Sequence, residues 1–291
     1  MPPHVSRCLT LLSLSLVVLS PLSAQSPAPK LEFPAASPSA TIKQRVGVTD
    51  FEIVYSRPGV KGRKIFGGLE AWGEVWRAGA NSATSISFNT PVKFNGTSVP
   101  AGKYGLFALI GQDQWSVILN KVPNQWGAYE YNAKDDVIRI PAKPVKLQQP
   151  VETFTIDLND LRDESATLNL IWENTRVPVK LEVDVVATLV PQIEAAMASD
   201  APKKPYVNAA MFYLDHNLDL KKANAWMDAA IAAEPDAFYL IYRKAKVQAK
   251  MGDKAGALAT AKISLDMAGK STGSIKDEYI RLNNELIASL R

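Results

Sequence analysis

Three short segments each place an aromatic residue within a few positions of an arginine, an amide or a carboxylate. They are residues 76–81 (WRAGAN), 125–129 (QWGAY) and 172–176 (WENTR). Tryptophan and tyrosine offer flat apolar surface, whereas arginine and asparagine offer directional hydrogen-bond donors. Because sugars, planar ligands, peptides and carboxylates are recognised by such a combination, the three tryptophans could line one groove.

The same residues also have a structural interpretation. Tryptophans commonly fill the cores of β-sandwiches, and Glu173 could pair with Arg77 or Arg176 beneath the surface. We therefore expect Arg77 to tie its loop to Glu173, and we rank this role above contact with a ligand. For the ligand-binding interpretation, the predicted contact residues are Arg57, Arg77, Asn81, Trp126, Tyr129, Glu173, Asn174 and Arg176.

Histidine and cysteine are too scarce for several common chemistries. The chain has two histidines and one cysteine, and His4 and Cys8 both fall in its first residues. A serine–histidine–aspartate triad built on His216, a thiol nucleophile and a zinc site are therefore not expected. Neither a dinucleotide-binding fingerprint nor an EF-hand loop is found in the sequence. We predict no catalytic residue, no metal ligand and no cofactor.

Carboxylates remain as the one route to catalysis. A hydrolase acting on carbohydrate or peptidoglycan would need two of them within about 5–10 Å of each other in one cleft. The alternative is that each is a surface charge or the partner of a nearby arginine. The candidates are Glu70, Glu74, Asp113, Glu130, Asp136 and Glu173.

The N-terminal residues are typical of a secretory signal peptide. Arg7 precedes an apolar run over 9–22, and Ala24 offers a small residue before a cleavage ahead of Gln25. The run is too short to favour a membrane span. We expect residues 1–24 to be removed and the product to be periplasmic or secreted, with no transmembrane segment left. Residues 25–40 are rich in proline, alanine and serine and indicate an extended linker.

Residues 41–190 have the pattern of an antiparallel β-domain. About nine short stretches alternate apolar and polar residues, no helical pattern intervenes, and Asn95-Gly96 is typical of a two-residue hairpin turn. The last stretch, 177–189, is a long alternation with charged residues on one face. An antiparallel β-sandwich or an open barrel is predicted. The net charge of +4 is scattered, so nucleic acid is not an expected partner.

Residues 191–291 have a helical composition and an internal period of 34. Asp219 matches Asp253 and Ala223 matches Ala257 at that offset, which is the tetratricopeptide period. This region resembles tetratricopeptide repeats over 206–291, with two degenerate copies and a final helix. A helical tetratricopeptide-like helix-hairpin domain is therefore predicted, and two hairpins with fortuitous alanine spacing are the alternative. Repeats of this kind generally bind proteins.

Seven motifs between residues 41 and 185 resemble, in order, an uncharacterised bacterial family of exported proteins called domain of unknown function 2911. The resemblance brings no known reaction and implies only that the motif residues are shared ones. The motifs are 55–58 (YSRP), 61–63 (KGR), 75–81 (VWRAGAN), 100–104 (PAGKY), 115–120 (WSVILN), 125–129 (QWGAY) and 172–174 (WEN).

The leading functional prediction is an exported, non-enzymatic two-domain protein of the cell envelope. Its β-domain would bind a small ligand or glycan, and its helical repeats would bind a protein partner. Two alternatives stay open. One is the carboxylate-dependent hydrolase, and the other is a purely structural envelope protein whose motifs only maintain the fold.

Overall fold

The computed structural model describes Met1 and residues 33–291, and the elements within this range form a β-domain followed by helices. The predicted signal peptide and residues 25–32 of the predicted linker lie outside the described residues. The strands are β1 (Ser39–Val46), β2 (Thr49–Ser56), β3 (Val75–Trp76), β4 (Thr84–Phe88), β5 (Val92–Phe94), β6 (Thr97–Val99), β7 (Gly102–Leu109), β8 (Trp115–Asn120), β9 (Asp136–Ala142), β10 (Val145–Arg162) and β11 (Ser165–Val183). The helices are α1 (Val185–Ala198), α2 (Tyr206–Asp215), α3 (Leu220–Ala233), α4 (Phe238–Met251), α5 (Lys254–Lys270) and α6 (Lys276–Ser289), and one 3-10 turn covers Ala133–Asp135.

The strands form two antiparallel sheets. The larger sheet has the order β1-β2-β4-β7-β8-β9, with β3 paired to β7, and the smaller has the order β10-β11-β5-β6. Within residues 39–183 the sheets do not close into a barrel, so the predicted antiparallel sandwich is confirmed. The Asn95-Gly96 turn joins β5 to β6 with both residues at positive φ (+45° and +86°), as predicted from that dipeptide.

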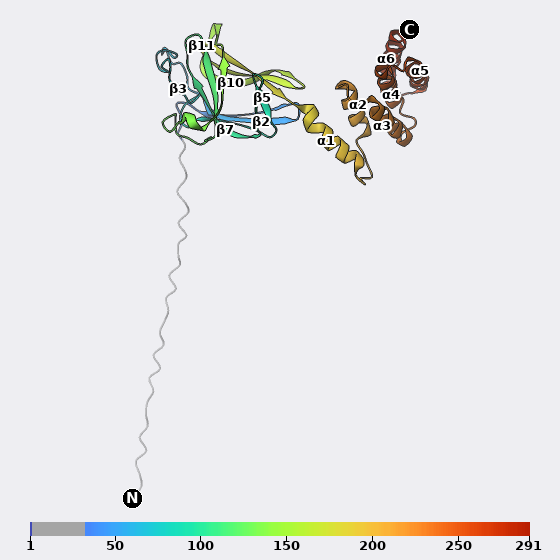
Figure 1. Cartoon of the computed structure of the whole chain (residues 1–291), viewed down its shortest axis with the longest axis horizontal. Coiled ribbons are helices and arrows are strands. Elements are labelled where there is room, and N and C mark those ends of the chain that lie inside the picture. Colours follow the sequence, from blue (N-terminus) through green and yellow to red (C-terminus); the bar gives the residue numbers. More distant parts are fainter. Residues whose placement is uncertain (2–32) are drawn as a thin grey trace. The chain divides into compact units, whose positions relative to one another are not determined.

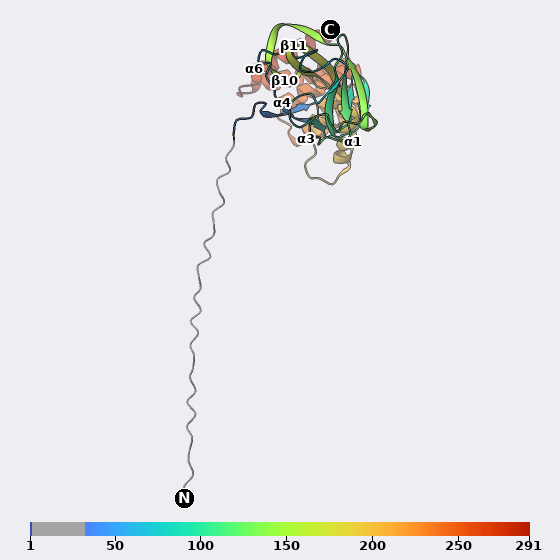
Figure 2. The same ribbon diagram turned by 90° about the vertical axis from the view of Figure 1, so that its left-hand side faces the viewer.

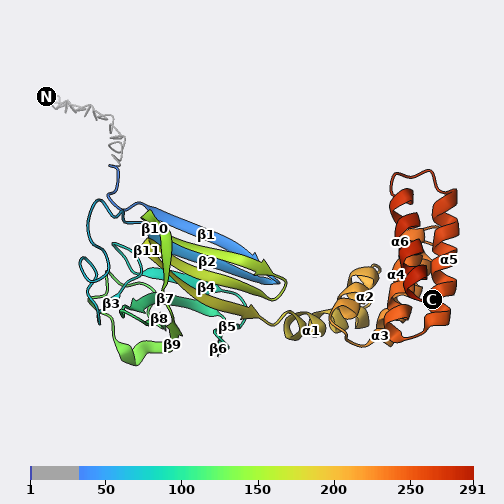
Figure 3. The same ribbon diagram turned by 90° about the horizontal axis from the view of Figure 1, so that it is seen from above.

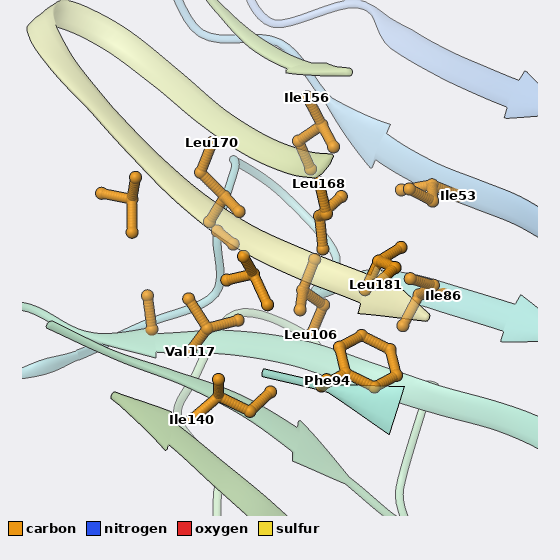
Figure 4. Packing of buried hydrophobic residues seen from close by; sticks show 14 of the residues in the cluster. Ile53, Ile86, Phe94, Leu106, Val117, Ile140, Ile156, Leu168, Leu170 and Leu181 are labelled. Atoms are coloured by element: carbon orange, nitrogen blue, oxygen red, sulfur yellow. The ribbon is translucent and has the colours of Figure 1, made fainter. Parts of the chain in front are cut away.

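One apolar core lies between the two sheets. Figure 4 shows side chains from both sheets pointing into the same space, among them Ile53, Leu106 and Val117 from the larger sheet and Leu168 and Leu181 from the smaller. All five are fully buried. Alternate residues of each strand face this core because side chains of a strand point to opposite faces in turn.

The β10–β11 hairpin is long and bends back on itself. The two strands lie side by side in Figures 1, 2 and 3. A straight strand of this length would span roughly 60 Å at about 3.3 Å per residue. Yet the Val183 N–H, at the end of β11, donates to the carbonyl oxygen of Glu164, just before its start, at 2.9 Å. The strand therefore runs out and returns, and Figure 4 shows the ribbon turning through a U.

The helices pack as successive antiparallel neighbours, α2 with α3 and α4 with α5 (Figure 3). The period of 34 seen in the sequence has a structural counterpart. Asp219 caps the N-terminus of α3 and Asp253 caps that of α5, while Ala223 and Ala257 are both fully buried. Small residues at these positions let paired helices approach closely. Among the described residues, no helix has both the length and the apolar character needed to cross a bilayer.

One predicted strand is wrong at its C-terminal end. The alternating pattern continues to Leu189, but β11 ends at Val183 and α1 begins at Val185. The Asp184 carboxylate accepts a hydrogen bond from the Ala187 N–H at 2.8 Å and so caps the helix. Pro191, expected to mark the change from strand to helix, lies inside α1.

Candidate functional site

Two of the three tryptophans in the aromatic–polar segments belong to the core. Trp76 and Trp172 are 2% and 1% exposed, and their rings stack with centroids 5.7 Å apart. Phe66, Phe154 and Trp115 pack around this pair. The interpretation in which three tryptophans line one groove is therefore wrong for Trp76 and Trp172, because a buried indole cannot contact a ligand from solvent.

The stack nevertheless brings two predicted contact residues into the same region. Arg77 follows Trp76, and Glu173 follows Trp172 in the segment where β11 reverses. Glu173 has φ +51°, a conformation that is strained for a non-glycine residue. It pairs with Val151 of β10, at a point where the register of the hairpin shifts. The aromatic core thus positions the backbone on which the polar residues are carried.

The loop that follows Trp76 is strained and tightly packed. Ala78 has φ +49° and is fully buried, and the Trp76 indole N–H donates to the Gly79 carbonyl oxygen at 3.1 Å. A Cβ on Gly79 would lie 2.9 Å from the carbonyl oxygen of Ser56, so only glycine fits there. Strain of this kind costs about 1–3 kcal/mol per residue and is concentrated at functional sites.

Asn81 and Arg57 are engaged within the protein. Asn81 has φ +59°, and its amide donates to the carbonyl oxygen of Ser37 at 3.2 Å and to the Ser56 hydroxyl at 3.3 Å. The Arg57 guanidinium donates to the Phe154 carbonyl oxygen at 3.0 Å and to Thr155 at 2.8 Å. Both side chains therefore hold the chain entering β1 and the β10 strand in place, which is a structural role.

A second loop, residues 121–131, lies directly against the first. The Gly127 N–H donates to the Asn81 carbonyl oxygen at 3.1 Å, and the Ala83 N–H donates to that of Gln125 at 2.9 Å. The loop carries the two exposed aromatic residues of the predicted set, Trp126 at 64% and Tyr129 at 83% exposed. Large apolar side chains this open to solvent are available for contact.

A buried polar network fixes the conformation of this second loop. The fully buried Asn120 amide donates to the Asn132 carbonyl oxygen at 3.1 Å and to Asp136 at 3.0 Å, and its oxygen accepts from the Val122 N–H at 3.0 Å. Asp136 also accepts from the Tyr131 hydroxyl at 2.6 Å. Burial and this hydrogen bond raise the pKa of Tyr131 to about 12.

Arg77 projects between the two loops. A Cβ on Gly127 would lie 2.7 Å from the Tyr129 ring and 3.5 Å from Nη1 of Arg77, so glycine leaves room for both side chains. The Nε of Arg77 is buried, and no described residue accepts its hydrogen bond. An unsatisfied buried donor of a charged group is unfavourable by about 1–3 kcal/mol or more, which a ligand or a water molecule would relieve.

The carboxylate that Arg77 acts on is Glu70. Burial raises the pKa of Glu70 from 4.5 to about 7, and the charges of Arg77 and Arg63 oppose that rise. Glu70 was one of the six candidate carboxylates but was not a predicted contact residue. Among the described residues no ion pair joins Arg77 to Glu173, so the expected tie between them is not what holds the loop.

The remaining predicted residues lie on the reversal of β11. Asn174 is exposed, and Arg176 pairs with Val145 of β10. The Nε of Arg176 is buried and, like that of Arg77, has no acceptor among the described residues. No pattern in the sequence indicated where Asn174 and Arg176 would lie relative to Trp126 and Tyr129.

The structure thus brings together the two loops that carry Arg77, Asn81, Trp126 and Tyr129, and we group Glu70 with them because the charge of Arg77 acts on its carboxyl. We call these five residues and their two loops the Arg77 site. Hollows elsewhere on the molecule involve none of them. One of about 590 Å³ on the larger sheet is lined by Lys43, Asp50, Glu52 and neighbours, and one of about 490 Å³ by Val190, Tyr213 and neighbours among the helices.

Comparison with known proteins identifies the β-domain only. Residues 37–181 match the model of a family described as protein of unknown function (DUF2911). No curated protein and no solved structure matches the chain. The match includes every residue of the Arg77 site and leaves out the helices.

Proposed function

Because the β-domain of this chain belongs to the DUF2911 family, we propose that the family's shared motif residues form a ligand-binding site, the Arg77 site, on an exported and non-enzymatic protein. One observation carries this proposal. Arg77, whose Nε is buried without a described acceptor, reaches the backbone of Gly127, and the loop at that point carries the exposed aromatic residues Trp126 and Tyr129. The guanidinium supplies directional donors and the rings supply flat apolar area, so the ligand has a polar head and a flat or apolar body.

The strained backbone supports the same conclusion. Ala78 and Asn81 are held at positive φ on either side of Gly79, and the aromatic core and the Asn120 network hold the flanking segments. A site whose backbone is fixed before the ligand arrives loses less conformational entropy on binding.

Saturation-transfer NMR with three probes tests the proposal. The probes are chitotriose, a short peptide with a free carboxyl terminus, and benzoate. We expect at least one to bind, and its signal to be lost in Arg77→Lys and in Trp126→Ala. Leu161→Ala is the matched control, because Leu161 is an exposed large apolar residue on β10 away from the site. If none of the probes binds, or if binding is unchanged in both variants, the site is not where we place it.

The envelope location is a proposal that rests on the predicted signal peptide. Cell fractionation and mass spectrometry of the mature N-terminus test it. Cleavage after Ala24 and recovery in the periplasm or medium are expected. An uncleaved chain recovered with the cytoplasm would contradict it.

The helical part is proposed as a protein-binding module. Supporting this is the hollow of about 480 Å³ between α2, α4 and α6, which is lined by Leu214, Lys246, Lys250 and Leu286 among others. A photocrosslinking residue replacing Lys250 is expected to trap a partner protein in the cell, whereas one replacing Ile263, exposed on α5, is not. Equal crosslinking at both positions would argue against a specific surface.

One observation favours the carboxylate hydrolase as a second candidate. The pKa of Glu70, about 7, would let its carboxyl donate or accept a proton near neutral pH. Turnover of chitotriose or peptidoglycan by the wild-type protein, abolished in Glu70→Gln, would establish this alternative. Absence of turnover, together with reversible binding, would favour the binding module. A stability loss in Arg77→Lys without any ligand would favour the purely structural alternative.

A further inference from the structure

Helix α1 is attached to the two helices that follow it. Val190 and Ile193 pack against the buried apolar cluster formed by α2, α3 and α4. On the next turn of α1, the Glu194 carboxylate accepts hydrogen bonds from the Tyr213 hydroxyl of α2 at 2.6 Å and from the Lys222 ammonium of α3 at 2.7 Å. These contacts hold one face of α1 beside the turn that joins α2 to α3.

A hollow of about 490 Å³ lies between α1 and that turn. We call it the α1–α3 groove. Its apolar wall includes Val190, Pro191 and Leu218, and its polar end is formed by Glu194, Asp219 and Lys222. Val190 and Leu218 are only partly buried, and Pro191 is exposed. The groove therefore presents apolar surface to solvent, and such surface is available to a binding partner.

Pro191 leaves a free backbone acceptor in the wall of the groove. It lies inside α1 and has no N–H, so the carbonyl oxygen of Ala187, one turn earlier, lacks its helical donor. The next carbonyl oxygen, that of Thr188, accepts from the Gln192 side chain at 2.9 Å, whereas no described side chain donates to Ala187. Because Ala187 lines the groove, its carbonyl oxygen is open to an N–H group of a partner.

The polar end of the groove has more acceptors than donors. Both hydrogen bonds to Glu194 end on Oε1. Both hydrogen bonds to Asp219, from the N–H groups of Lys221 and Lys222, end on Oδ1. Among the described residues nothing donates to Oε2 of Glu194 or to Oδ2 of Asp219. Two carboxylates and one ammonium give the lining a net charge of −1, so the complementary ligand is a cationic donor.

We propose that the α1–α3 groove docks a segment of a partner protein in which aliphatic side chains are combined with lysine or arginine. The aliphatic side chains cover Val190 and Leu218. A cationic side chain reaches the free oxygens of Glu194 and Asp219, and a backbone N–H of the segment donates to the Ala187 carbonyl oxygen. The groove contains no residue of the Arg77 site and shares no lining residue with the hollow between α2, α4 and α6, so this proposal goes beyond both.

Fluorescence anisotropy of a labelled peptide, titrated with the full chain, tests the proposal. The probe is a hexapeptide of alternating leucine and lysine, blocked at both ends. In two matched peptides, glutamate replaces lysine or serine replaces leucine. We expect saturable binding of the probe and affinities lower by about tenfold or more for both matched peptides. Binding of the probe should also weaken as salt rises from about 50 to about 500 mM, because salt screens exposed charges.

Two variants locate the bound peptide. Asp219→Asn removes a charge but keeps a good N-cap residue for α3, and Pro191→Ala supplies the N–H that the Ala187 carbonyl oxygen lacks. Each should weaken binding by about two- to tenfold while leaving the helices folded, as checked by circular dichroism. Asp253→Asn is the matched control, because Asp253 caps α5 in the same way but does not line the groove. Its affinity should equal that of the wild type.

Each other outcome overturns the proposal. If the probe does not bind, or if either Asp219→Asn or Pro191→Ala binds it as tightly as the wild type, the docking contacts are not those we describe. If binding is lost instead in Asp215→Asn, the peptide lies in the hollow between α2, α4 and α6, which Asp215 lines. If octylamine binds with dependence on Asp219 and the peptide does not, the groove holds a small amphiphile. None of these results bears on the Arg77 site.

Discussion

Replacing Glu70 by glutamine should stabilise the β-domain, and by more at high pH than at low pH. The carboxyl of Glu70 has its pKa raised by burial from 4.5 to about 7 in the folded protein. Below pH 4.5 both folded and unfolded chains are protonated there, so the group has no effect. Between 4.5 and 7 the unfolded chain loses the proton first, so the free energy of unfolding falls as the pH rises. Above pH 7 the carboxyl is ionised in both states, and the free energy of unfolding has fallen by its full amount.

The size of the effect follows from the same pKa. A change of one in the pKa corresponds to about 1.36 kcal/mol. The rise in the pKa of Glu70 from 4.5 to about 7 therefore sets an upper limit of about 3 kcal/mol on the effect. The carboxyl keeps some contact with solvent, and screening reduces the figure to roughly 1–2 kcal/mol. Glutamine has almost the same shape and no charge. The variant should therefore gain about 1–2 kcal/mol over the wild type at pH 8 and almost nothing at pH 4.

Urea unfolding followed by tryptophan fluorescence measures this difference. Five of the six tryptophans lie before residue 181, so the signal reports mainly on the β-domain. Glu74→Gln, at an exposed position, controls for the loss of a negative charge alone. A Glu70→Gln gain that is equal at pH 4 and pH 8 would refute the reasoning. So would a loss of stability at pH 8, because it would mean that the ionised carboxyl is stabilised by its arginines.

Other changes test the structural roles of single residues. Trp76→Ala should lower the free energy of unfolding by about 3–5 kcal/mol, whereas Trp126→Ala should change it by less than about 0.5 kcal/mol. Urea titration distinguishes the two variants. Equal effects would contradict the assignment of Trp76 to the core and Trp126 to the surface. Asn120→Ala should lower it by about 2–4 kcal/mol, since several buried groups lose their partners, and should weaken the amide-exchange protection of residues 121–131. Asp219→Ala and Asp253→Ala should each destabilise the helices by about 1 kcal/mol. The loss is measured as a lower midpoint of unfolding followed by far-UV circular dichroism. If neither variant has an effect, helix capping does not explain the period of 34.

The sequence was sufficient for the architecture because its signals are local. Alternation of apolar residues and the Asn95-Gly96 turn depend on residues close in the chain, and the offset of 34 can be found by comparing the sequence with itself. The same locality caused the error after Val183. Val185 and Leu189 are four residues apart, so they share one face of a helix as well as one face of a strand, and the capping role of Asp184 decided the outcome.

The site was only partly predictable, because its geometry comes from contacts far apart in the chain. Arg77, Trp126 and Tyr129 were found from their residue types, but the pairing of their loops depends on backbone hydrogen bonds between residues 81–83 and 125–127. Glu70 has no neighbouring motif that marks it, since its altered pKa arises from burial. Trp76 was mistaken for a groove residue because nothing local tells a core tryptophan from an exposed one.

The chain enters the β-domain through a short segment, residues 36–38, that is held by Asn81 of the Arg77 site and by two residues outside the site. The Lys61 ammonium donates to the carbonyl oxygen of Ala36 at 3.3 Å, the Asn81 amide to that of Ser37 at 3.2 Å, and the Arg57 N–H to that of Pro38 at 2.9 Å. Because Asn81 belongs to the Arg77 site, residues 36–38 are anchored at the edge of that site. A truncation that removes residues 36–38 would therefore take away a hydrogen-bond partner of Asn81, so a shortened protein used in binding experiments should begin ahead of them.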